Sequence, residues 1–292
     1  YGDMWDNIGS LQNWGIEFNV GADPVRIQNF NWQTELNLSL NRNKVLDLGE
    51  DEKIPQTSKQ YEETIFLEVG QPTSVFYTYV FDGIWQTKEE IDNNPSRPSD
   101  IPGMPRYKDV NEDGLISSDD KELVGNPHPK IIYGWNNVIS WGNFTFSIFF
   151  QGMYGHDLFN NTKRSLFDRA AFRNDYWRLK DPSDPSLGGT TNEQPLPGAE
   201  GLFIDNTYLE KGSYLRLKNL SINYSLPVNL VNKIGMKGLS VYLTGHDLFT
   251  FTNYSGMNPE ANRSGGSSTR MGIDYSTYPI VKTYMIGVNV TF

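Results

Sequence analysis

The side chains with the clearest potential for chemistry lie in residues 109–120, which read DVNEDGLISSDD. Their spacing follows the loop of an EF-hand, in which oxygen ligands at positions 1, 3, 5, 7, 9 and 12 surround a cation and a glycine at position 6 makes a sharp turn. Because every ligand is an oxygen atom, the pattern predicts a hard divalent cation, Ca²⁺ first and Mg²⁺ second. The predicted ligands are Asp109, Asn111, Asp113, the carbonyl of Leu115, Ser117 and Asp120, with Gly114 at position 6.

Two features distinguish this segment from a complete EF-hand. Asp120 occupies position 12, where a bidentate glutamate is usual, and a proline-containing stretch at residues 95–105 precedes the loop in place of a helix. The alternative interpretation is an acidic turn that binds no metal. In either case we expect the segment to stiffen a long loop and to take no part in catalysis.

Other reactive groups are sparse. The chain has no cysteine, which excludes disulfides, thiolate metal sites and a cysteine nucleophile. The pentapeptide GHDLF occurs twice, at residues 155–159 and 245–249, but the chain has only three histidines and no acidic cluster beside them. We therefore interpret both copies as strand ends at a rim rather than as part of a metal-dependent phosphohydrolase. No pair of carboxylates stands out as the acid and nucleophile of a glycosidase, so we predict neither an enzyme nor an organic cofactor.

The amino-acid composition further limits the fold classes and partners that this protein could have. Twenty-five basic and 35 acidic residues give a net charge of −10, which argues against a nucleic-acid partner. Aromatic residues reach 13%, and glycine and asparagine are frequent, as in all-β proteins. No run of about 20 apolar residues predicts a transmembrane helix.

Hydrophobic alternation with period two runs through the chain. Residues 14–22, 30–40, 144–151 and 284–292 each place large apolar side chains on one face and mainly asparagine, glutamine, serine, threonine or glycine on the other. An outward apolar face with a polar, wet interior is typical of a transmembrane β-barrel. We expect the apolar residues of these strands to face lipid, among them Phe18, Trp32, Phe144, Phe146, Phe150, Val288 and Val290.

The strands and their connections predict a barrel topology across residues 1–292. We expect nine strands at residues 11–22, 30–42, 61–69, 73–86, 130–141, 144–154, 209–226, 238–250 and 279–292. Long connections follow every second strand, at residues 43–60, 87–129, 155–208 and 251–278, and short ones lie between. Short periplasmic turns and long extracellular loops alternate in this way in outer-membrane barrels, so we expect a periplasmic C-terminus.

Nine strands cannot close such a barrel, because bacterial single-chain barrels have an even number of strands. We therefore expect this sequence to be the C-terminal portion of a longer polypeptide. Its edge strands, residues 11–22 and 279–292, should pair with strands outside it. The terminal Phe292 after an alternating strand is common in outer-membrane proteins.

Four stretches of the chain resemble the SusC-like TonB-dependent transporters of Bacteroidota. They are residues 107–160, which begin YKDVNEDGLISSDD, and GSYLRLKNLSINYSLP (212–227), VYLTGHDLFTFTNYSGMNPE (241–260) and YPIVKTYMIGVNVTF (278–292). Their order also matches, and the resemblance covers nearly the whole chain. It implies the last nine strands of a 22-stranded barrel with a plug in its lumen.

The same resemblance implies location and partners. The location would be the outer membrane of a Gram-negative bacterium, where the barrel imports oligosaccharides, or less often peptides. The implied partners are a SusD-like surface lipoprotein, TonB, the plug and remaining strands of the same polypeptide, outer-membrane lipids and, as a further arrangement, a second copy of the barrel.

The alternative is a soluble calcium-binding β-rich module that binds carbohydrate. It would explain the acidic loop and the aromatic residues, but neither the alternation of turns nor the terminal phenylalanine. Five aromatic side chains in the predicted loops could stack on sugars, although packing within the loops or contact with a lid is the interpretation that we favour for each. They are Trp85, Tyr154, Phe159, Trp177 and Tyr254.

Overall fold

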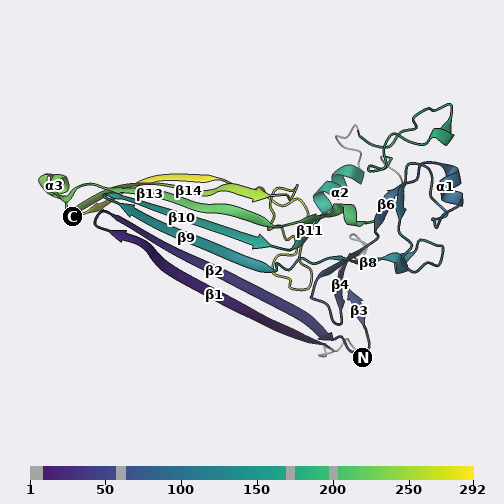
Figure 1. Ribbon diagram of the computed structural model, residues 1–292, viewed down its shortest axis with the longest axis horizontal. Helices are drawn as coiled ribbons and strands as arrows, with labels where there is room; N and C mark the ends of the chain where they lie inside the picture. Colours follow the sequence, from purple (N-terminus) through teal and green to yellow (C-terminus); the bar gives the residue numbers. More distant parts are fainter. Residues whose placement is uncertain (1–8, 57–63, 169–174, 197–202) are drawn as a thin grey trace, which may run out of the picture.

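The computed structural model describes residues 9–56, 64–168, 175–196 and 203–292. In these residues a long antiparallel sheet leads, at one end, into a lobe of short strands and helices (Figure 1). The sheet has seven strands, whose order in space is their order along the chain. They are β1 (Ser10–Ile27), β2 (Phe30–Asp47), β9 (Ile131–Trp141), β10 (Phe144–Tyr154), β13 (Tyr214–Ser225), β14 (Gly238–Thr252) and β16 (Thr283–Thr291). Among the described residues no helix is long and apolar enough to cross a membrane.

The all-β, partial-barrel fold class is confirmed, but the expected count of nine barrel strands is wrong. Residues 61–69 and 73–86 were expected to be barrel strands, and residues 61–63 lie outside the described part. The remainder forms short strands of the lobe, β4 (Ile65–Glu68), β5 (Val75–Thr78) and β6 (Phe81–Ile84), while β2 pairs directly with β9. The reason is burial on both faces: all four residues of β5 are buried, so its apolar content reflects a core and not one side of a membrane wall.

Cross-strand pairing aligns the apolar residues into rows on one side of the sheet, because paired residues point to the same face. At one end Phe30 pairs with Trp141, Trp141 with Phe144, and Phe144 with Tyr224. The next row contains Trp32, Ile139, Phe146, Ile222, Leu243 and Ile286. We call this side the apolar face. Much of it is exposed, with Phe18 at 55% and Ile286 at 79%.

The seven residues expected to face lipid all lie on the apolar face. Phe18 pairs with Leu38, Phe150 with Leu217, Val288 with Val241 and Val290 with Leu239, in the same alternation as the rows above. The opposite side, which we call the polar face, carries rows such as Asn31, Ser140, Thr145 and Asn223. The predicted alternation is therefore present across the whole sheet.

A close approach on the apolar face requires one glycine. A Cβ at Gly152 would collide with the Cζ atom and the hydroxyl oxygen of Tyr133 on the neighbouring strand. Tyr133 crosses this glycine and donates its hydroxyl to the carbonyl of Tyr214, 2.9 Å away on the strand beyond. The tyrosine thus covers the backbone of Gly152 and links three adjacent strands.

Short and long connections separate to the two ends of the sheet. Two-residue links join β1 to β2 and β9 to β10, and residues 226–237, with α3 (Val228–Val231) and η5 (Asn232–Ile234), join β13 to β14. The C-terminus lies at this end, which we call the turn end (Figure 1). The long connections, residues 48–130, 155–213 and 253–282, form the lobe at the opposite loop end. The predicted alternation of lengths therefore holds with seven strands.

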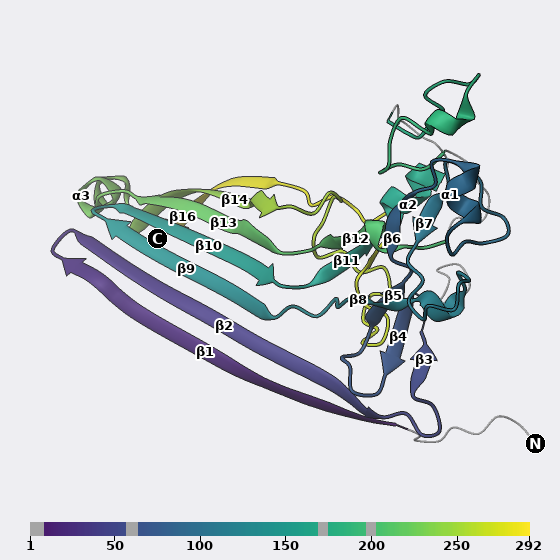
Figure 2. The ribbon, with the colours of Figure 1, turned by 45° about the vertical axis from the view of Figure 1, so that its right-hand side comes forward.

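The lobe is built from all three long connections (Figure 2). The first connection contributes the sheet β3 (Lys53–Pro55), β4, β5 and β8 (Glu122–Gly125), the pair of β6 and β7 (Pro105–Tyr107), α1 (Lys88–Asp92) and η2 (Ser118–Asp120). The second contributes β11 (Asp157–Asn160), α2 (Asn161–Asp168), η3 (Pro185–Leu187), η4 (Asn206–Tyr208) and β12 (Leu209–Lys211), and β11 pairs with β15 (Ile273–Asp274) of the third.

One hydrophobic core holds the three connections together. Ile65 and Phe76 of the first connection, Phe159, Ile204 and Tyr208 of the second, and Ile273 of the third form a single buried cluster. The long sheet has no such core on its apolar face, whose side chains point outward. The lobe therefore excludes water by packing, and the sheet needs another apolar medium.

We predict a depth-dependent cost for arginine on the apolar face. Phe150 lies nearer the middle of the apolar rows than Phe146, so Phe150→Arg should lower the free energy of unfolding by about 2–4 kcal/mol and Phe146→Arg by less. Chemical unfolding of the full-length protein in lipid vesicles measures both. Ser147→Arg, on the polar face between them, is the matched control and should be tolerated. Equal tolerance at all three positions would contradict a lipid-facing apolar face.

Candidate functional site

The predicted metal loop folds around its own carboxylates. The amide of Gly114 donates to Asp109 Oδ2 at 2.9 Å, and the amide of Leu115 donates to Asp113 Oδ1 at 2.8 Å. Gly114 has φ +85°, the left-handed turn for which glycine is suited. The side-chain oxygen of Asn111 accepts from the amide of Asp113 at 3.1 Å. These bonds give the segment the compact turn that its sequence predicts.

Asp120 closes the loop. Its fully buried carboxylate accepts from the amide of Val110 at 2.9 Å and from the amide of Ser117 at 2.7 Å. The carboxylate at position 12 therefore joins the two ends of the loop through backbone amides. Sequence reasoning placed it as a metal ligand and did not anticipate this second role.

One feature of this loop favours a bound cation, and two features do not. Asp109 Oδ1 is buried and accepts no hydrogen bond, which leaves one oxygen for a cation. The amide nitrogen of Asn111 donates to Asp113 Oδ2 at 2.9 Å, so these two side chains bond to each other. Within the described ranges no three acidic or histidine side chains gather closely enough to hold a metal. The calcium site therefore stays a prediction.

Four of the five candidate stacking aromatics are packing residues of the lobe. Trp85, Phe159, Trp177 and Tyr254 are buried, whereas Tyr154, at the end of β10, is 58% exposed. The Trp85 indole donates to Asp100 at 3.1 Å, and Asp100 forms a buried ion pair with Arg97 at 2.7 Å. Burial, with a hydrogen bond to Asp274 at 2.6 Å, raises the pKa of Tyr254 well above its usual range.

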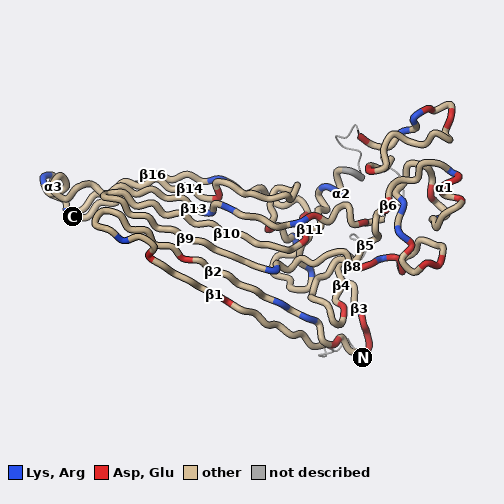
Figure 3. The backbone as a smooth tube through the Cα atoms, in the orientation of Figure 1, with Lys and Arg blue, Asp and Glu red and all other residues tan. Residues whose placement is uncertain are grey.

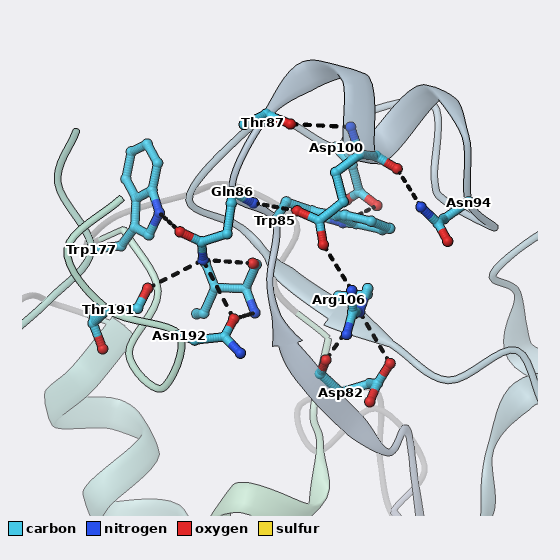
Figure 4. Close-up of polar contacts among 12 residues, drawn as sticks. Asp82, Trp85, Gln86, Thr87, Asn94, Asp100, Arg106, Trp177, Thr191 and Asn192 are labelled. Carbon is cyan, nitrogen blue, oxygen red and sulfur yellow. Dashed lines mark hydrogen bonds and ion pairs between the residues drawn. The ribbon is translucent and has the colours of Figure 1, made fainter. Parts of the chain in front are cut away.

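Gln86 joins the first and second connections (Figure 4). Its side-chain oxygen accepts from the amide of Gly189 at 2.9 Å and from the Trp177 indole at 3.4 Å. Its nitrogen donates to the carbonyl of Thr191 at 3.2 Å. Nearby, the amide of Ile84 donates to Asn192 at 2.7 Å. Sequence reasoning missed these contacts because the partners lie about 100 residues apart and carry no local motif.

The two GHDLF copies have different surroundings. The first follows β10, as expected of a strand end, and Asp157 accepts from Lys211 at 2.7 Å and from the amide of Asn126 at 3.1 Å. Burial lowers the pKa of His156, whose ring lies 3.2 Å from the carbonyl of Pro259. The second copy lies inside β14, where the register shifts, so it does not end a strand. Its Asp247 pairs with Lys218 of β13 at 2.8 Å.

A buried arginine attaches the third connection to the sheet. Arg216 of β13 lies on the polar face near the loop end and is 2% exposed. Its guanidinium forms an ion pair with Glu260 and donates to Thr250 at 3.0 Å and to Asn258 at 3.4 Å. Glu260 and Asn258 belong to residues 253–282, so this cluster fixes the connection over the polar side of the rim. Nothing in the local sequence indicated it.

Comparison with known proteins shows which proteins this chain is related to. No protein-family model matches the chain. Its sequence is 34% identical to a TonB-dependent receptor of Formosa agariphila, in an alignment that covers 100% of this chain and 30% of that protein. It is 26% identical to the TonB-dependent receptor SusC of Bacteroides thetaiotaomicron, over 99% of this chain and 27% of that protein. The chain is homologous to TonB-dependent receptors, SusC among them.

The fold agrees with this relationship. The RagAB peptide transporter superposes with a TM-score of 0.71 and 21% sequence identity, over 98% of this chain and 30% of that one. The resemblance to SusC-like proteins inferred from the sequence is thus confirmed. The chain spans less than a third of the length of the two receptors.

We predict that calcium orders the acidic loop through Asp113. Added Ca²⁺ should protect residues 87–129 of the full-length protein from proteolysis, and Asp113→Ala should remove that protection without unfolding the sheet, because the loop lies in the lobe. Limited proteolysis with and without Ca²⁺ measures this. Asp119→Ala removes an exposed carboxylate of the same loop outside the ligand set and should keep the protection. A wild-type protein indifferent to Ca²⁺ would contradict the site.

We predict that Glu260→Ala releases the third connection. It leaves the buried Arg216 without its carboxylate, which should cost the docked connection about 1–3 kcal/mol. Cleavage within residues 253–282 should therefore rise while the sheet stays folded. Glu193→Ala, which removes an exposed glutamate of the second connection, is the control. Equal cleavage in both variants would show that the ion pair does not hold the connection.

Proposed function

We propose that this chain forms part of the wall and extracellular lobe of a TonB-dependent transporter that imports oligosaccharides or peptides across the outer membrane. The observation that carries the proposal is the exposed apolar face of the seven-stranded sheet, in a chain homologous to TonB-dependent receptors over its whole length. The transport would use no covalent chemistry. Binding at the loop end and displacement of a plug would move the substrate.

The apolar face supports a membrane setting. Ile16, Phe251 and Ile286 are each more than 60% exposed, and exposed large apolar side chains occur on six of the seven strands, all except β13. Water-exposed patches of this extent are rare on soluble proteins. The aromatic row of Phe30, Trp141, Phe144 and Tyr224 matches the girdle that marks a barrel's interface with water. These features favour the barrel over the soluble carbohydrate-binding module.

The connections support one orientation of the sheet. Short turns are periplasmic and long loops extracellular in barrels of this kind, so the turn end and the C-terminus would lie in the periplasm. The lobe would then face the medium, where a SusD-like lipoprotein could cover it. RagAB, which shares the fold, is known as a peptide importer with open and closed states. It supports an import role and leaves both substrate classes open.

The sheet edges support a larger assembly. β1 and β16 each have one neighbour within the sheet, so one backbone edge of each is unpaired there. Unpaired edges are not tolerated in hydrocarbon, because each unsatisfied backbone group costs several kcal/mol. Strands outside this sequence, together with a plug, would complete the barrel.

We predict that residues 1–292, expressed alone with a signal peptide, form no closed monomeric barrel. The unpaired edges of β1 and β16 should prevent stable insertion, whereas the full-length protein should give a protease-resistant band in outer membranes whose gel mobility changes on heating. Membrane fractionation and electrophoresis with and without heating compare the two. A heat-modifiable monomer from residues 1–292 would contradict the partial-barrel proposal. Failure of the full-length protein to reach the outer membrane would contradict the proposed function.

A further inference from the structure

The charged residues of the apolar face have the same sign and lie at the same end of the sheet. From the turn end up to the register shift beside Leu11, the paired positions of this face carry two charged residues, Arg42 and Lys44. Both are cationic, although the chain has a net charge of −10. Arg42 pairs with Trp14, and Lys44 pairs with Gln12, at the loop end of β2. Figure 3 shows basic segments on β2 toward its loop end.

Strand geometry places these cations at a membrane boundary. Twelve residues separate Arg42 from Phe30 in the aromatic row at the turn end. At about 3.3 Å per residue this is roughly 40 Å along the strand, or about 30 Å across a membrane for strands tilted by about 40°. The hydrocarbon core is about 30 Å thick, so Arg42 lies at the level of the lipid headgroups on the loop side.

The backbone of a third basic residue, Lys130, contacts Arg42. The Arg42 guanidinium donates to the carbonyl of Lys130 at 2.9 Å and to its neighbour's carbonyl, that of Asn41, at 2.7 Å. The side chain of Lys130 is exposed. In the part of the chain that the structure describes, no carboxylate lies within ion-pair distance of Arg42, Lys44 or Lys130. These charges are therefore available to an anion.

A cavity of about 800 Å³ beside Lys130 offers room for that anion. It is bordered by Tyr154, which occupies an apolar-face position of β10, and by the polar side chains of Asn126, Ser213 and Asn253. Lys211 and Asp157 also border it and form an ion pair at 2.7 Å, and the Lys211 side chain is largely exposed. Cations and hydrogen-bond donors thus meet at the point where the apolar face ends.

We infer that Arg42, Lys44 and Lys130 bind the phosphate groups of a membrane lipid in the outward-facing leaflet. The acyl chains would lie along the apolar face below, and the headgroup would extend into the cavity beside Lys130. Clusters of lysine and arginine at a membrane surface attract anionic headgroups in this way. The inference rests on the proposed function, because it requires the apolar face to lie in a bilayer.

The test measures lipid binding by the full-length protein. Diphosphorylated lipid A is titrated onto protein in neutral detergent, and bound lipid is counted by native mass spectrometry. The triple variant R42Q/K44Q/K130Q should bind on the order of 100-fold more weakly, about fivefold for each charge removed. The variant R26Q/K233Q/K237Q removes three exposed charges at the turn end and should bind like the wild type. Dephosphorylated lipid A should bind weakly to all three proteins.

Three results of the binding measurement would overturn the inference. The first is unchanged lipid A binding by R42Q/K44Q/K130Q, and the second is an equal loss of binding in R26Q/K233Q/K237Q. The third is displacement of lipid A by inorganic phosphate at a similar concentration, which would point to a site for free anions. Normal insertion of every variant into outer membranes, with no preference for phosphorylated lipid, would overturn only this inference. Failure of the wild type to insert would overturn the proposed function and the inference together.

Discussion

The pairing register of the seven long strands is the constraint on which the rest of the structure depends. Each interior strand satisfies its backbone through two neighbours, and in a bilayer no water could replace a lost partner. The same register decides which side chains face outward, because a slip of one residue would exchange the two faces of a strand. Phe30, Trp141, Phe144 and Tyr224 meet at one level only in this register.

The lobe follows the opposite rule, since its apolar residues point inward. Phe76, Phe159 and Ile273 come from three different connections and share one core, beside smaller buried clusters that lie within the first connection. Gln86 and Arg216 add polar links between connections and between lobe and sheet. The loops therefore behave as one folded unit, and a ligand or lid that approaches the loop end meets a preformed surface.

Sequence reasoning succeeded where periodicity was the cause of structure. The expected strand 144–154 matches β10 in full, and 130–141 and 238–250 differ from β9 and β14 by one or two residues. It failed at β4 and β5, because short apolar runs buried on both faces resemble membrane strands when each is considered alone. In the acidic loop the turn of Gly114 was predictable from a local motif, whereas the contacts of Gln86 and Arg216 depend on partners distant in sequence.

The charged residues add a second constraint to the one that the pairing register imposes. An apolar face without charges would let a sheet slide along the membrane normal at little cost, whereas polar groups at both limits fix its height. Here the aromatic row marks the turn end, and Arg42 and Lys44 mark the loop end of the same face. The lobe beyond them carries the carboxylates of residues 109–120, which could not enter hydrocarbon. In the proposed membrane setting, the alternation that satisfies the backbone would thus also set the depth and direction of the sheet.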